Sequence, residues 1–130
     1  MRIFFLLGLY LLLAGCTRLT ANHQLDEAYR AYAAGDCAAV ALALSRVERS
    51  IRARPYLQPE VSLLRGQCLE RQQLFVDAGQ TYQFILQHYP RSEYAFRARA
   101  RLDTLQQLGH WPATDVQVST ARDQPLPGKP

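Results

Sequence analysis

The side chains of this sequence that could carry covalent, metal or acid–base chemistry are three cysteines, three histidines and eleven carboxylates. His23, His88 and His110 lie too far apart to supply the closely spaced ligands of a metal site. Cys37 and Cys68 have no neighbouring histidine that would activate a thiol as a nucleophile. No phosphate-binding glycine loop or HExxH motif is present, so we expect neither an enzyme nor a metal or cofactor site. Four glutamates stand in charged helical sequence without a second group suited to acid–base catalysis: Glu48, Glu60, Glu70 and Glu93.

The third cysteine, Cys16, follows an apolar segment at the start of the sequence. Arg2 supplies one positive charge, and an uninterrupted apolar run of eleven residues extends from Ile3 to Leu13. Two small residues, Ala14 and Gly15, then lead into the cysteine. A basic start, a short apolar stretch and a small-residue cleavage site are the features of a secretory signal peptide.

Residues 13–16 (Leu-Ala-Gly-Cys) resemble the lipobox of bacterial lipoproteins. The resemblance implies a diacylglycerol thioether on Cys16, cleavage before it and acylation of the new amine. We therefore expect residues 1–15 to be a cleaved signal peptide and residues 16–22 to be a lipidated N-terminus and tether. A fatty anchor of this kind would attach the protein to a membrane outside the cytoplasm.

Two other interpretations of this segment are possible. A membrane-spanning anchor needs about 20 apolar residues, and the run here has eleven before polar residues begin. An ordinary signal peptide in which Cys16 is incidental is the second alternative. Thr17, in place of aspartate after the modified cysteine, resembles outer-membrane lipoproteins. We expect an anchor in the outer membrane on its periplasmic face, with retention in the inner membrane as the other destination.

With Cys16 assigned to lipid, Cys37 and Cys68 remain. An even number of cysteines in an oxidising compartment is most simply a disulfide. Such a bridge would close a loop of about 31 residues and stabilise the fold by roughly 3–4 kcal/mol. Two buried, unreactive thiols are one alternative, and a redox-active pair in a sensor subunit is another.

Size and charge limit the possible functions. Removal of residues 1–15 leaves 115 residues, enough for one small domain. The formal net charge is +4, and every basic residue except Lys129 is an arginine. The arginines are scattered along the chain without a basic tract, which argues against a nucleic-acid partner.

Most of the sequence reads as helix, because lasting period-two alternation is missing and alanine, leucine, glutamine and arginine dominate. Gly35 and Gly109 are expected to end helices, and Asp36 and Ser92 to cap the helices that follow. These signals divide residues 23–110 into five helices: about 24–34, 37–54, 59–73, 76–88 and 93–108.

The composition changes after the last predicted helix. Residues 112–130 carry four prolines among polar residues, so we expect residues 111–130 to form a disordered, proline-rich tail. Trp111 stands just past the last helix. We expect its side chain to pack back over that helix, and a partner-binding site is the alternative.

An internal repeat underlies the helical pattern. The clearest unit runs from Pro59 to Pro90 and resembles the tetratricopeptide pattern, with a small residue at position 8 and an aromatic residue at position 24. A weaker unit begins at Ala21, and a third register begins at Glu93 but leaves the pattern after one helix. The resemblance implies an all-α fold of two tetratricopeptide-like hairpins and a C-terminal capping helix, a short right-handed α-solenoid. The residues that carry it are Gly66, Phe75, Ala78, Tyr82, Ile85 and Pro90, with Ala28, Val40, Leu44 and Val47 in the first unit and Ala100 in the third.

Stacked helical hairpins form a groove that is lined mostly by their first helices. Tyrosine and arginine are the residues that most often anchor protein interfaces. The alternative for the tyrosines is the core, and the arginines could simply solvate the surface. The candidate partner-binding residues are Tyr29, Arg30, Tyr32, Arg65, Arg71, Arg97 and Arg101.

These features favour a lipid-anchored, periplasm-facing adaptor or scaffold that binds another envelope protein. The segment 84–95 is similar to helical repeats of envelope proteins, which points to outer-membrane or secretion-complex assembly. We expect the membrane and a protein as partners, without a nucleic acid or small-molecule substrate. A structural spacer of the envelope and an accessory or regulatory sensor subunit are the alternatives.

Overall fold

The computed structural model describes residues 20–52 and 55–112, and every regular element within them is helical. The first helix includes residues 20–33. The predicted all-α fold of packed helix pairs is therefore confirmed. The remaining elements are α2 (Cys37–Ser50), the 3-10 helix η1 (Pro55–Leu57), α3 (Gln58–Arg71), α4 (Phe75–His88) and α5 (Glu93–Gln107).

Several predictions concern residues outside this description. They are the signal peptide (1–15), the lipid on Cys16, and the tail beyond Pro112. Within residues 20–52 and 55–112, no helix combines the length and the apolar character that crossing a membrane requires.

The helix ends follow the predicted capping residues. The Asp36 carboxylate accepts a hydrogen bond from the Ala39 amide at 2.9 Å, and the Ser92 hydroxyl accepts one from the Ala95 amide at 3.1 Å. Each bond satisfies an amide that the first turn of a helix leaves unpaired. Gly35 has a φ of 79°, in the left-handed region that glycine adopts without strain. Asp36 and Ser92 therefore cap the helices that follow them, and Gly35 ends the first helix, as the sequence predicts.

The second helix ends four residues earlier than predicted, at Ser50 rather than 54. Ile51 turns its side chain into the core, where it is 2% exposed, and Arg52 lies in a turn. Pro55 follows closely, and a proline disfavours helical geometry in the residue before it. The break gives the chain room to reverse into α3.

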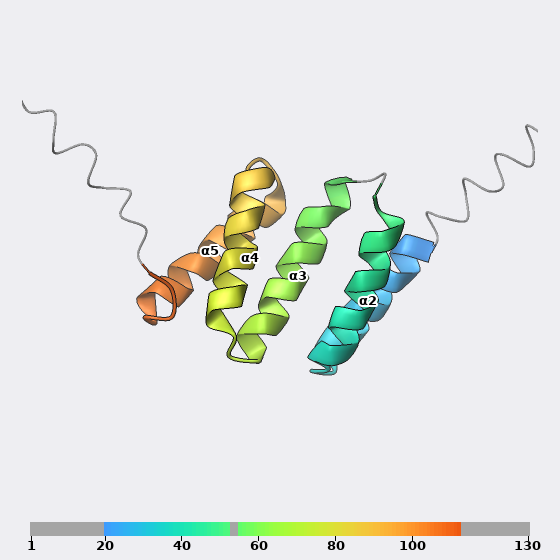
Figure 1. Cartoon of the computed structure of the whole chain (residues 1–130), viewed down its shortest axis with the longest axis horizontal. Helices are drawn as coiled ribbons and strands as arrows, with labels where there is room; N and C mark the ends of the chain where they lie inside the picture. The colour runs from blue at the N-terminus through green and yellow to red at the C-terminus, as the bar shows by residue number, and fades with distance from the viewer. Residues whose placement is uncertain (1–19, 53–54, 113–130) are drawn as a thin grey trace, which may run out of the picture.

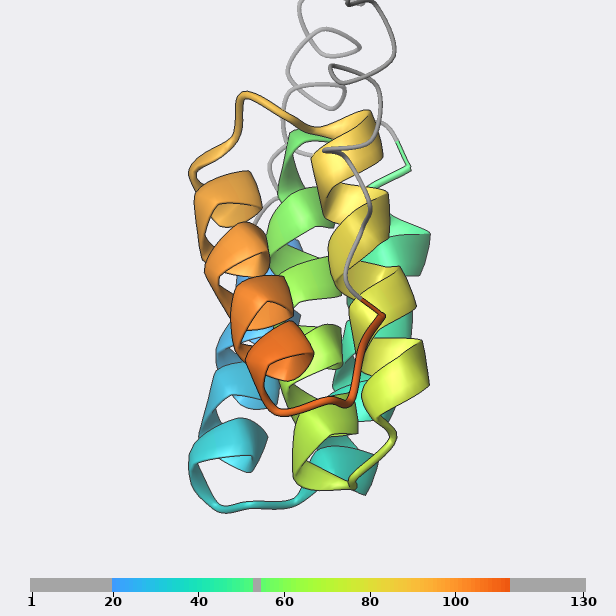
Figure 2. The ribbon, with the colours of Figure 1, turned by 90° about the vertical axis from the view of Figure 1, so that its left-hand side faces the viewer.

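The helices stack as consecutive hairpins (Figure 1). The first helix pairs with α2, α3 pairs with α4, and α5 packs on α4 and on α3. Seen from the α5 end, the first helix and α5 lie along one side of the stack and α2 and α4 along the other, with α3 between them (Figure 2). The central helix α3 therefore borders both hairpins.

Two hydrophobic clusters meet at α3, which explains why its buried residues are spread around its circumference. One cluster joins the first helix and α2 to one side of α3, and the other joins a different side of α3 to α4 and α5. From α3, Val61, Leu64 and Cys68 enter the first cluster and Leu63 enters the second. A helix that is buried on two sides ties the hairpins into one unit.

Helices α3 and α4 pack closely where Gly66 meets Tyr82. Tyr82 is fully buried, and its ring lies directly on Gly66, so that a methyl group at Gly66 would overlap the ring. The sequence prediction of a small residue where the two helices cross is therefore confirmed. The equivalent alanine of the first hairpin, Ala28, is also fully buried, in the same cluster as Leu44.

A disulfide joins Cys37, at the start of α2, to Cys68, near the end of α3. The two Cα atoms are 5.5 Å apart, and the residues are 8% and 5% exposed. The predicted bridge is confirmed, and it spans the junction between the two hairpins. Its loop of 31 residues corresponds to a stabilisation of about 3–4 kcal/mol in the chain-entropy treatment.

The predicted tether, residues 16–22, extends too far. Residues 20–22 belong to the first helix, and Ala21 is only 1% exposed. Ala21, Leu25 and Ala28 are spaced four and three residues apart, and together they form the stripe that packs on α2. Polar neighbours on either side of Ala21 obscured this stripe in the sequence.

Trp111 belongs to the folded domain rather than to the predicted tail of 111–130. Its ring packs against the second cluster and lies on Gly79 of α4, where a methyl group would overlap it. The side chain thus folds back onto the domain, and its ring lies on α4, whereas the sequence predicted that it would pack over the last helix. Gly109, with a φ of 74°, reverses the chain so that the tryptophan can reach this position.

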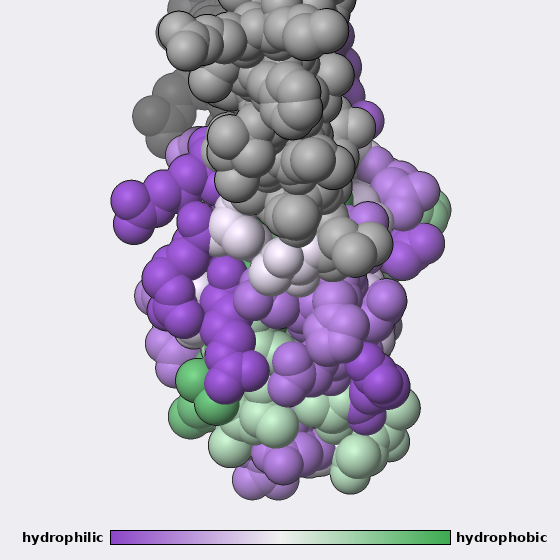
Figure 3. All heavy atoms as spheres, turned by 90° about the vertical axis from the view of Figure 1, so that its right-hand side faces the viewer, coloured by the Kyte–Doolittle hydropathy of each residue, from purple (hydrophilic) through white to green (hydrophobic). Residues whose placement is uncertain are grey.

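The end of the stack formed by the first helix and α2 carries an apolar area on its surface. Hydrophobic residues gather there toward one end of the two helices, among more polar neighbours (Figure 3). On α2, Leu42 is 56% exposed, and Ala38 and Ala41 are exposed beside it. Isolated exposed apolar residues of this kind are common on protein surfaces.

Candidate functional site

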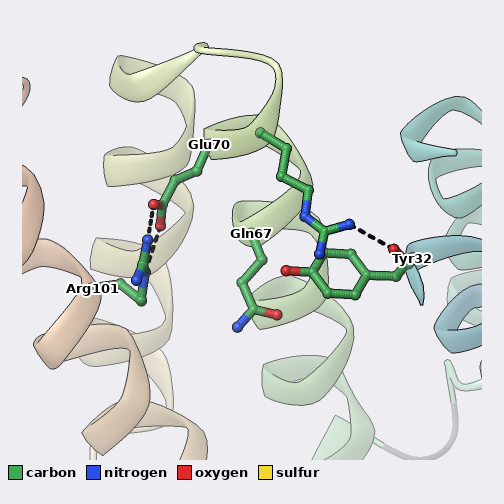
Figure 4. A pocket seen from close by; sticks show the side chains of 5 residues that line it. Tyr32, Gln67, Glu70 and Arg101 are labelled. Carbon is green, nitrogen blue, oxygen red and sulfur yellow. Dashed lines mark hydrogen bonds and ion pairs between the residues drawn. The ribbon is translucent and has the colours of Figure 1, made fainter. Parts of the chain in front are cut away.

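The first helix, α3 and α5 direct polar and aromatic side chains into one hollow of about 340 Å³. We call this surface the groove and define it by residues from these three helices. In Figure 4, Gln67 lies between the Arg101–Glu70 pair on one side and Tyr32 on the other. The groove residues are Tyr29, Tyr32, Glu60, Gln67, Glu70, Arg71, Tyr94, Arg97 and Arg101.

Arg71 and Tyr32 form one wall of the groove. The guanidinium carbon of Arg71 lies 3.6 Å from the centroid of the Tyr32 ring, and its Nη1 donates a 2.6 Å hydrogen bond to the Tyr32 carbonyl. This carbonyl, in the last turn of its helix, also accepts a hydrogen bond from the Gly35 amide at 3.0 Å. None of the ion pairs in the described part of the chain involves Arg71. The groove therefore presents an exposed positive charge here.

Glu70 and Arg101 form the opposite wall. The Arg101 guanidinium donates two hydrogen bonds to the Glu70 carboxylate, one of them from Nε at 2.9 Å, and the Tyr82 hydroxyl donates a third at 2.5 Å. The Glu70 side chain is only 10% exposed, whereas that of Arg101 is 43% exposed. The hydrogen bond to Glu70 raises the pKa of Arg101 further above its ordinary value. Burial, together with Glu70, raises the pKa of Tyr82.

A single carboxylate, Glu60 of α3, lies near tyrosines of the first helix and of α5. The Tyr29 hydroxyl of the first helix donates a 2.7 Å hydrogen bond to Glu60. Burial and the charge of Glu60 raise the pKa of Tyr94, on α5, to about 12. Burial and the Glu60 hydrogen bond likewise raise the pKa of Tyr29.

Arg97 and Arg30, which the sequence also predicted for the groove, are not among the residues that line the hollow. Arg97 lies 5.6 Å from the centroid of the Tyr94 ring, and its Nη2 is 3.7 Å from a Glu93 oxygen. Arg30 is exposed and donates to a backbone oxygen of its own helix, that of Asp26, at 3.3 Å.

Arg65 does not belong to the groove, which corrects the sequence prediction. It points to the opposite side of α3 and donates two hydrogen bonds, of 2.8 and 2.9 Å, to Glu48 of α2. Burial alone would raise the pKa of Glu48, but the hydrogen bond and charge of Arg65 outweigh burial and lower it. Arg65 is one turn from Ser62 and shares its side of the helix, whereas Arg71 shares a side with Gln67 and Glu60. Arg65 therefore ties α3 to α2.

Three groove residues of α3, Glu60, Gln67 and Glu70, were missing from the predicted set, as was Tyr94. Glu60, Gln67 and Arg71 are spaced seven and four residues apart, which places them on one side of a helix. This spacing could have revealed the groove once Arg71 had been chosen. Tyr94 was assigned to the apolar face of its helix, and it does pack at the edge of the second cluster.

The histidines do not come together. The His110 ring stacks on Phe75, with centroids 3.9 Å apart, and the His88 ring stacks on Phe84 at 4.4 Å. Within the described residues, no three histidine, cysteine or acidic side chains are grouped so that they could hold a metal ion.

Comparison of the chain with protein-family models, with characterised proteins and with solved structures gave no match. Its function must therefore be inferred from the groove. Tyr29 is already engaged with a carboxylate, and Arg101 is engaged with another. These contacts hold the side chains in place, and Arg71 and Gln67 also line the hollow.

Proposed function

We propose that this protein is a lipid-anchored adaptor of the bacterial envelope that binds a segment of another envelope protein in its groove. The observation that carries the proposal is the convergence of side chains from the first helix, α3 and α5 on one open hollow of about 340 Å³. Its walls hold arginine and tyrosine side chains, the types that dominate the binding energy of protein interfaces. A hollow of this size accepts a few residues of an extended chain.

The charges of the groove indicate what the bound segment carries. Glu60 and Glu70 already accept hydrogen bonds from groove side chains, whereas Arg71 stacks on a ring and donates to a neutral carbonyl. An acidic side chain or a terminal carboxylate from the partner would complete the Arg71 site with a charge-assisted hydrogen bond. The side-chain amide of Gln67, which lies between the walls, would form hydrogen bonds with the backbone of the same segment.

A tetratricopeptide-like arrangement supports this use of the groove. In the two hairpins a small residue of the first helix, Ala28 or Gly66, is buried with a large residue of the second, Leu44 or Tyr82. Stacks of such hairpins bind partners along the surface formed by their first helices. The first helix, α3 and α5 are the corresponding helices of this chain.

The lipid anchor rests on the sequence around Cys16, which lies outside the described residues. Replacement of the cysteine by Cys16→Ser should abolish incorporation of labelled palmitate and release the protein from the membrane fraction. Outer-membrane attachment predicts that the wild-type protein co-sediments with outer-membrane markers in a sucrose gradient. Palmitate labelling that persists in the variant would contradict the anchor.

Site-specific cross-linking tests the groove. A photo-reactive amino acid at Gln67 in the intact cell should form an adduct with one other envelope protein. Arg71→Glu should reduce this adduct at least about tenfold, as expected for an interface hot spot, without altering the circular dichroism spectrum. Arg49→Glu, at an exposed residue of α2 remote from the groove, is the matched control and should leave the adduct unchanged. Equal yields with both variants would contradict binding in the groove.

The two alternative functions predict other outcomes. A structural spacer would lose its function when residues 112–130 are deleted and would tolerate the Arg71 change. A redox sensor requires that the Cys37–Cys68 pair opens and closes in living cells. Thiol trapping that finds the pair permanently oxidised would exclude the sensor.

A further inference from the structure

The outer side of α5 has no covering helix in the described part of the chain. Phe96 is 78% exposed, and Ala100, one turn further along the same side, is also exposed. Asp103 extends this exposed stripe by another turn. We call Phe96, Ala100 and Asp103 the α5 stripe. Phe96 and Ala100 leave apolar surface in contact with water, and covering it would be favourable.

The repeat of the chain identifies the stripe. Ser62, Gly66 and Leu69 stand 34 residues before Phe96, Ala100 and Asp103. On α3 two of these positions face the second helix of the hairpin: the Tyr82 ring of α4 lies on Gly66, and Leu69 packs against the cluster that contains Tyr82.

The first hairpin repeats this arrangement. Ala28, at the position of Gly66, is fully buried in the cluster that contains Leu44 of α2. Two hairpins of this molecule therefore show what covers the stripe: a second helix, antiparallel to the first. On α5 the same side is open, because the chain turns at Gly109 and places Trp111 on Gly79 of α4 instead.

We propose that the α5 stripe is a docking site for an amphipathic α-helix of another protein, which completes the third hairpin as α2 completes the first. The alanine at position 100 specifies the chemistry of that helix. Gly66 accepts an aromatic ring in direct contact, whereas Ala28 is buried with a leucine. A leucine or isoleucine of the partner helix packs on Ala100, its neighbours enclose Phe96, and a basic residue pairs with Asp103.

The occupant comes from another chain because residues 113–130 lack the necessary pattern. Their large apolar residues are Val116, Val118 and Leu126, a spacing that does not form a stripe along a helix. The site is separate from the groove, since Phe96 is absent from the residues that line the hollow. Groove binding and helix docking can therefore fail or succeed independently.

A photo-cross-linking experiment on the full chain in intact cells tests this proposal. Benzoylphenylalanine replaces Phe96 in one strain and Val76, which is 59% exposed on α4, in a control strain. Adducts are digested, and the linked peptide is mapped by mass spectrometry. We expect an adduct at position 96 and not at 76, mapped to an amphipathic helical segment of a second protein with an aliphatic stripe and a basic residue.

A second variant tests whether the adduct at position 96 depends on the α5 stripe. Ala100→Glu, at an exposed position, should leave the melting temperature unchanged and reduce the adduct at position 96 at least about tenfold, as for loss of an interface hot spot. Mapping of the adduct to residues 113–130 or to a second copy of this chain, distinguished by mixed isotope labelling, would overturn the proposal. A yield at position 96 no greater than at 76 would overturn it as well. Cross-linking from position 67 is measured in the same cells. An adduct there would support binding in the groove whether or not the α5 stripe binds a helix.

Discussion

Gly66→Ala should destabilise the protein even though alanine is the better helix former. In an unconstrained helix the exchange would add about 1 kcal/mol of stability. Here the new methyl group would overlap the ring of Tyr82, which is fully buried between α3 and α4. Overpacking of this kind costs about 1–3 kcal/mol. Because the ring must move, its hydrogen bond to the Glu70 carboxylate is lost as well, and a bond to a charged group contributes about 1.5–3 kcal/mol.

Together with the gain in helix propensity, these contributions give a net loss of about 1.5–5 kcal/mol. In a domain of this size each kcal/mol lowers the melting temperature by about 4–8 °C, so the variant should melt roughly 6 °C or more below the wild type. Thermal and urea unfolding, both followed by circular dichroism at 222 nm, measure the change. The disulfide should be kept oxidised throughout, so that the two proteins differ only at the helix crossing.

A double variant identifies the cause. Gly66→Ala combined with Tyr82→Leu reproduces the alanine–leucine pair that the first hairpin has at Ala28 and Leu44. The double variant should therefore lose less stability than the sum of the two single variants, by at least about 1 kcal/mol. Additive losses, or a melting temperature raised by Gly66→Ala alone, would refute a crossing limited by the tyrosine ring.

Three further predictions concern other contacts. Gly79→Ala should displace Trp111, the single tryptophan of the chain, and red-shift its fluorescence emission; an unchanged spectrum would contradict its packing on α4. Replacement of Cys37 and Cys68 together by serine should lower the free energy of unfolding by about 3–4 kcal/mol, measured in urea, and a loss below about 1 kcal/mol would show that the bridge constrains little. Because the pKa of Glu48 is lowered below its ordinary value of 4.5, its pairing stabilises the protein above that pH and is lost as the pH falls through the folded pKa. Urea midpoints should therefore decline below about pH 4.5 less steeply in Glu48→Gln than in the wild type, and parallel declines would assign the acid sensitivity to other groups.

The helices could be predicted from the sequence because their end signals are local. Asp36 and Ser92 bond to amides three residues away, so capping depends on few residues and leaves a clear pattern. The disulfide could also be predicted, since the two cysteines fell on neighbouring hairpins of the repeat. The start of the folded domain was harder to locate, because the apolar stripe there begins with a single alanine, Ala21, among polar residues.

The groove was predicted only in part, and the reason lies in α3. This helix is buried against two clusters, so apolar and small residues occur around much of its circumference. The spacing of apolar residues along α3 therefore does not show that Arg71 faces the groove and Arg65 faces α2. Arg65 and Arg71 are alike in sequence, and only the position of Glu48 on α2 separates them.

The Glu60 contact has a consequence for the speed of recognition. The Glu60 carboxylate accepts a hydrogen bond from Tyr29 and lies near Tyr94, so side chains of the first helix, α3 and α5 are ordered around it before any ligand arrives. The entropy of ordering these side chains is then lost during folding rather than during association. The proposed partner segment would meet side chains that are already in place, so that encounter and orientation would limit its association rate. Differences in affinity among partner sequences should accordingly be expressed in their dissociation rates.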